Sequence, residues 1–103
     1  MKIIIVEDES IIRNGLVKHI KWESLGISEI RVAANTQEAL TICESYIPDI
    51  VVSDISMPGE NGILLCRKLR KLFPDIEIIF VTGYADKEYL KAAIDLHAVR
   101  YVE

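Results

Sequence analysis

A short run of strand-forming residues that ends on an acid constrains this chain more than any other feature. Residues 50–54 read Ile-Val-Val-Ser-Asp, and Pro58 and Gly59 follow closely. An apolar, β-branched run of this length is typical of a strand that is buried on both faces. Such a strand delivers Asp54 to its carboxyl end, the edge where ligands bind in open α/β sheets. A plain loop-capping role for Asp54 stays open at this point.

Apolar runs and helical patterns alternate along the whole chain. Strands are predicted at residues 3–6, 30–34, 50–54, 76–81 and 99–102. The apolar positions of the helices between them are Ile12, Leu16 and Ile20; Ala39, Leu40, Cys43 and Ile47; Leu65, Leu69 and Leu72; and Leu90, Ala93, Ile94 and His97. The residues placed to cap these helices are Ser10, Asn35 with Glu38, and Asp86. This alternation predicts an α/β fold, in which helices cover both faces of a parallel sheet.

Composition excludes several classes of protein. The 103 residues suffice for one domain, and the formal net charge of −4 gives no reason to expect contact with nucleic acid. No apolar stretch approaches the roughly 20 residues of a membrane span, and acids directly follow the apolar residues 3–6, unlike in a signal peptide. We therefore expect a cytoplasmic protein. Cys43 and Cys66 are too few for a zinc site and are predicted to be buried hydrophobic residues.

Polar side chains stand at the ends of three predicted strands. Glu7 and Asp8 end the first, Asp54 ends the third and Thr82 ends the fourth. In a parallel sheet these ends share one edge, where clustered carboxylates would repel one another unless a cation compensated them. Mg²⁺ prefers oxygen ligands, and a carboxylate can act as a nucleophile toward a phosphoryl group. Taken separately, the first two acids could serve a helix dipole, and Thr82 could be an ordinary cap.

Four segments carry a resemblance to a known family: residues 5–9, 54–62, 81–84 and 98–102. With them the chain resembles the receiver domain of bacterial two-component response regulators, from Lys2 to Glu103. The resemblance implies a single receiver domain over residues 1–103. It also implies a flavodoxin-like, doubly wound parallel sheet of five strands in the order 2-1-3-4-5.

The resemblance further implies the roles of the acids. Asp54 would be the phosphoacceptor, which takes a phosphoryl group from a sensor histidine kinase. Asp8, Asp54 and the backbone carbonyl of Ser56 would ligate Mg²⁺ directly, and Glu7 would act through water. The family more often has aspartate at position 7, so Glu7 is expected to alter metal affinity without abolishing it.

The resemblance also implies two switch residues and a type of output domain. Thr82 would move toward the phosphoryl group, and Tyr101 would swing inward with it. Residues 21–26 are similar to those of receivers attached to AraC-type helix-turn-helix domains. The expected partners are therefore a sensor kinase and a C-terminal DNA-binding output domain outside this chain, with no direct nucleic acid contact by this segment and no membrane contact.

The end of the chain departs from the family pattern. A lysine that pairs with the phosphoryl group would fall one residue after Glu103, and a fifth helix would follow it. We therefore expect a domain that is incomplete at its C-terminus, with part of one sheet face uncovered. An uncovered apolar face predicts self-association or exchange of elements between two copies.

Three rival functions stay open. A phospho-independent interaction module would keep the pocket without using it. A haloacid-dehalogenase-type phosphatase would want a second aspartate where Ser56 stands. A flavin-binding module would need a phosphate-binding loop where residues 7–9 are acidic. The prediction is a signalling domain that is not an enzyme.

Overall fold

The computed structural model describes residues 1–54, 62–81 and 100–102. Its elements in chain order are β1 (Lys2–Val6), α1 (Ser10–His19), the 3₁₀ helix η1 (Trp22–Leu25), β2 (Glu29–Ala33), α2 (Thr36–Ile42), β3 (Ile50–Asp54), α3 (Gly62–Leu72), β4 (Glu77–Val81) and β5 (Arg100–Val102). Ser56, Thr82 and the helix predicted after Asp86 lie outside the described residues. Tyr101 lies in β5.

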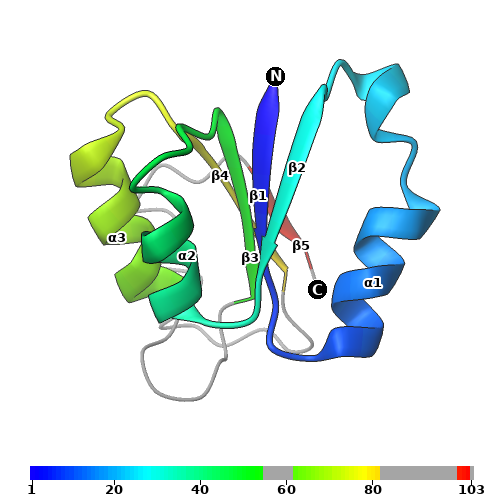
Figure 1. The fold of residues 1–103 in the computed structure, drawn as a ribbon, viewed down its shortest axis with the longest axis horizontal. Coiled ribbons are helices and arrows are strands. Elements are labelled where there is room, and N and C mark those ends of the chain that lie inside the picture. The colour runs from blue at the N-terminus through cyan, green and yellow to red at the C-terminus, as the bar shows by residue number, and fades with distance from the viewer. Residues whose placement is uncertain (55–61, 82–99, 103) are drawn as a thin grey trace.

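The strands form one parallel sheet in the order β2-β1-β3-β4-β5. This is the order that the family resemblance implied. Figure 1 shows α1 on one side of the sheet and α2 with α3 on the other. The two central strands, β1 and β3, carry unbroken apolar runs because both of their faces are covered.

The two faces of the sheet are packed unequally. The larger core lies under α2 and α3, where Leu65, Leu69 and Phe80 are fully buried. A smaller cluster on the α1 side includes Ile3, Ile5 and Val52. None of the ten residues of α1, all of them described, is buried. The α1 side is therefore the thinner half of the core.

The helix termini test the predicted caps. At α2 the backbone N–H of Glu38 donates to Asn35 Oδ1 at 2.8 Å, and the N–H of Ala34 donates to Glu38 Oε1 at 3.3 Å. The first bond confirms the predicted cap at Asn35, and in the second Glu38 accepts from the residue before the cap. The cap at Ser10 is wrong, because Ser10 is the first residue of α1 and the N-cap, Glu9, makes no capping bond with its side chain.

Three residues predicted to lie on buried helix faces are exposed, and one of them, Ile12 of α1, is 44% exposed. Ile47 is 66% exposed because α2 ends at Ile42, well before Pro48. The residue before a proline is disfavoured in the helical region, so Pro48 sets only the latest possible end of the helix. Leu72 is 59% exposed because it is the last residue of α3 and lies beyond the packed part of that helix.

Both cysteines are free and buried, as predicted. Burial raises the pKa of the Cys66 thiol to about 12, which keeps it protonated and unreactive. Among the described helices, none is long and apolar enough to cross a bilayer.

Candidate functional site

The site begins with the register of the two central strands. Val6 of β1 pairs with Ser53 of β3, so the residues that follow them, Glu7 and Asp54, leave the sheet side by side. The backbone N–H of Glu7 donates to the Ala33 carbonyl at 3.0 Å, which holds it in line with the sheet. The acids of β1 and β3 therefore share the carboxyl edge.

Three carboxylates meet at this edge. Glu7, Asp8 and Asp54 each offer an oxygen, and these oxygens all lie within 4.8 Å of one another. Glu7 is only 3% exposed, whereas Asp8 and Asp54 are half-buried. The structure thus brings together the three acids whose convergence the sequence led us to expect.

Burial and charge act on Glu7 together. Loss of solvent raises its pKa to about 7, and the negative charges of Asp54 and Asp8 act in the same direction. The N–H of Glu9, which donates to Glu7 Oε1 at 3.2 Å, opposes them. Without a cation, the repulsion among the three carboxylates is therefore reduced when Glu7 binds a proton near neutral pH.

The donor set fits a hard divalent cation. Clustered carboxylate oxygens are the ligands that Mg²⁺ takes, and it keeps several waters in addition. Asp8 and Asp54 are half-buried and so remain accessible to solvent, while Glu7 is buried. A cation bound here would replace the proton that the raised pKa of Glu7 indicates.

Sequence reasoning missed three neighbours of the acids. Arg13 Nη1 donates to the backbone oxygen of Glu7 at 2.9 Å and so fixes the turn that carries Asp8. Ser53 is fully buried, and its hydroxyl donates to the backbone oxygen of Asp54 at 3.0 Å. Gly62 begins α3 beside Asp54. Ser53 gave a signal, since it is the one hydroxyl in the apolar run of β3.

Of the predicted switch residues, only Tyr101 lies within the described residues. Ser56 and Thr82 fall outside the described ranges, so their predicted roles stay predictions. Tyr101 lies opposite Phe80 in the β4–β5 register. This places position 101 on the strand next to β4, and its predicted switching role also stays a prediction.

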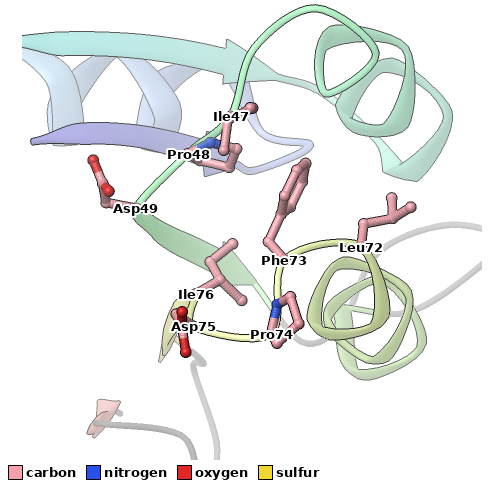
Figure 2. Close-up of a pocket in the computed structure, with 8 residues that line it drawn as sticks. All are labelled: Ile47, Pro48, Asp49, Leu72, Phe73, Pro74, Asp75 and Ile76. Atoms are coloured by element: carbon pink, nitrogen blue, oxygen red, sulfur yellow. The ribbon is translucent and has the colours of Figure 1, made fainter.

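A separate hollow lies at the opposite edge of the sheet (Figure 2). Its volume is about 250 Å³, and its lining residues are Ile47, Pro48, Asp49, Leu72, Phe73, Pro74, Asp75 and Ile76. Asp49 stands just before β3, roughly 16 Å from Asp54 at about 3.3 Å per residue. Asp49 Oδ2 also accepts the backbone N–H of Lys2 at 2.8 Å. This hollow is therefore distinct from the acidic cluster.

Comparison with known proteins agrees with the fold. The family model of the response regulator receiver domain matches residues 3–103. This chain belongs to the response regulator receiver family. The family consists of signalling proteins, and the acidic cluster lies at the carboxyl edge of its receiver fold.

Three relatives illustrate the match. The transcriptional regulatory protein HptR of Staphylococcus aureus is 37% identical over 101 residues, which are 98% of this chain and 39% of HptR. A two-component transcriptional regulator AraC from Clostridium phytofermentans has a TM-score of 0.92 and 43% identity, over 100% of this chain and 80% of that chain. TrrA from Thermotoga maritima, solved in complex with Mg²⁺-BeF, has a TM-score of 0.79 and 35% identity, over 98% and 84%. This receiver domain therefore spans about two fifths of the length of HptR.

Proposed function

We propose that this receiver domain accepts a phosphoryl group on Asp54 from a sensor histidine kinase and thereby controls a DNA-binding output domain. The observation that carries the proposal is the cluster of three carboxylates within 4.8 Å at the carboxyl edge of the sheet. One of them ends the central strand β3, where a nucleophile is held by the rigid part of the fold.

The chemistry is a transfer between two side chains. A carboxylate oxygen of Asp54 attacks the phosphorus of a phosphohistidine, a P–O bond forms, and the P–N bond breaks with its electron pair going to the imidazole. Asp8, Asp54 and the Ser56 carbonyl would hold Mg²⁺, with Glu7 acting through water. When bound, the cation neutralises negative charge on the phosphoryl oxygens. Thr82 would donate its hydroxyl to the phosphoryl group, and Tyr101 would follow it inward.

The relatives support the cation and the output. TrrA was solved with Mg²⁺ and BeF, and HptR and the AraC relative are named as transcriptional regulators. We extend these properties to the protein that carries this domain. A helix-turn-helix output of the AraC type, a cytoplasmic location and the absence of multiple-turnover phosphatase activity are parts of the same proposal.

Labelling with acetyl phosphate and Mg²⁺ tests the proposal. Intact mass should increase by one phosphoryl group in a version of the chain extended past Glu103 to include the lysine expected there, and the same version with Asp54→Asn should stay unlabelled. Asp49→Asn is the matched control, because Asp49 lies at the opposite edge of the sheet and should not affect labelling. Labelling of Asp54→Asn at the wild-type level would contradict the proposal. If Mg²⁺ with beryllofluoride also caused no spectral or association change in the version extended past Glu103, a phospho-independent interaction module would be favoured instead.

A further inference from the structure

Gly62 occupies a place where any side chain would strike the backbone of Asp54. A Cβ built on Gly62 overlaps the backbone oxygen of Asp54, and it lies 2.6 Å from Ser53 Oγ and 3.0 Å from the carbonyl carbon of Asp54. Two of these three atoms, the oxygen and carbon of the Asp54 carbonyl, belong to the main chain and cannot rotate away. Gly62 is helical, so glycine is required here for space and not for an unusual backbone conformation.

Ser53 completes this contact from the strand side. Its side chain is fully buried, and its hydroxyl donates to the backbone oxygen of Asp54 at 3.0 Å. The hydroxyl therefore lies between the last peptide of β3 and Gly62, the first residue of α3, and the missing Cβ of Gly62 allows the two elements to come this close.

The position of Asp54 matters because its carboxylate lies in a crowded cluster. One of its carboxylate oxygens lies within 4.8 Å of a carboxylate oxygen of Glu7 and of one of Asp8, the two acids that follow β1. Mg²⁺ requires near-octahedral geometry with ligands at about 2.0–2.1 Å, so a shift of β3 by a few tenths of an ångström degrades the site. Gly62 and Ser53 both contact the carbonyl group of Asp54, the residue whose carboxylate must be placed.

We propose that Gly62 and Ser53 are positioning residues that set the Asp54 carboxylate against Glu7 and Asp8, at the distance a divalent cation needs. The inference rests on the proposed function, because it concerns the same cation site. Gly62 acts by close approach, and Ser53 acts by its hydrogen bond to the Asp54 carbonyl. Neither residue touches the cation or the phosphoryl group.

The test is a titration of the 103-residue chain with MgCl₂, followed by two-dimensional amide NMR of four variants. Gly62→Ala should raise the dissociation constant for Mg²⁺ at least about tenfold, the range typical of residues that orient metal ligands. Ser53→Ala should raise it by a smaller factor, since it removes a hydrogen bond without adding atoms. Gly15→Ala is the matched control, because its added Cβ would meet only His19 Cδ2 at 3.7 Å. Asp54→Asn tests the cation site itself.

The measurement separates position from stability. The dissociation constant is read from the folded resonances, so a variant that is merely less stable keeps the wild-type value. If the wild type shifts with Mg²⁺ and both Gly62→Ala and Ser53→Ala bind it equally well, the inference is overturned while the proposed function stands. If the wild type does not bind Mg²⁺, both fail. If Gly62→Ala does not fold, Ser53→Ala decides: weaker binding supports the inference, and unchanged binding overturns it.

Discussion

Glu7 shows what burial does to a single residue. In the unfolded chain its carboxyl has an ordinary pKa of 4.5, and burial beside Asp54 and Asp8 raises the folded value to about 7. The folded state therefore holds its proton more tightly than the unfolded state. The stabilising contribution of this proton is fully present below about pH 4.5 and is lost as the pH rises through about 7.

Glu7→Gln should consequently stabilise the cation-free protein at pH 8 and leave it nearly unchanged at pH 5. The expected gain at pH 8 is up to a few kcal/mol, because glutamine removes the buried charge. Urea unfolding in the presence of a chelator measures it, with the exposed Glu44→Gln as control. Addition of Mg²⁺ should stabilise the wild type at pH 8 and should stabilise Glu7→Gln less, because Asp8 and Asp54 remain while the water-mediated contact of Glu7 is weakened. Equal stability of wild type and Glu7→Gln at both pH values would refute this account of the site.

The sequence was sufficient for some residues of the site and not for others. Convergence of Glu7, Asp8 and Asp54 follows from parallel strand ends, which is a property of topology. The protonation of Glu7 depends on its burial depth, and the need for glycine at position 62 depends on how closely α3 approaches β3. Both are distances between elements, which a one-dimensional pattern does not contain.

At the scale of single elements, local signals predicted the start of α2 correctly but not its end. The Asn35–Glu38 cap was readable because both partners lie within four residues. The end of α2 was not, since Pro48 only sets the latest possible end and the helix stops at Ile42. As a result Ile47 passes from a predicted core position to the exposed rim of the hollow in Figure 2.

Asn35→Ala tests the energetic weight of this cap. The change removes the acceptor of the Glu38 N–H, and the free energy of unfolding should fall by about 1 kcal/mol. Urea denaturation monitored by circular dichroism gives the value. Asn14→Ala, at an exposed position inside α1, should cause no loss, because alanine is the better helix former there. Losses of similar size in the two variants would show that the cap has no special role.

Tyr46 links elements that are distant in the chain. Its hydroxyl donates to the Ile3 carbonyl at 3.0 Å and lies 3.3 Å from the Glu29 carbonyl, which ties the loop after α2 to β1 and β2. Tyr46→Phe should reduce the free energy of unfolding by about 1 kcal/mol, the usual net value of one buried hydrogen bond. The same urea experiment measures it. An unchanged midpoint would mean that this hydroxyl contributes nothing to stability.

At the scale of the whole molecule, the sheet is covered unequally. Ile78 and Phe80 of β4 are fully buried on the α3 side, whereas Ile79 and Val81, on the α1 side, are only half-buried. Ile11 of α1 is 85% exposed. The parallel sheet with helices on both faces followed from the alternating pattern of the sequence, and the strand order followed from the family resemblance. The unequal burial described here concerns residues 1–54, 62–81 and 100–102 alone.

Because the described residues cover the α1 side less completely, we still predict self-association through that side. Apolar side chains on the α1 side would gain burial in a contact between two copies. Sedimentation velocity over increasing protein concentration should show a rising dimer fraction, and Ile11→Lys should lower it. A single monomer boundary at all concentrations would remove the prediction without affecting the cation site.

The central claim is that one divalent cation sits among the acids of β1 and β3. Anomalous diffraction from crystals soaked in Mn²⁺, which accepts the same oxygen ligands as Mg²⁺, tests it most directly. Our account predicts one strong peak in direct contact with Asp8 and Asp54 and with Glu7 nearby. A peak elsewhere, no peak at all, or Glu7 and Asp54 on opposite edges of the sheet would contradict it.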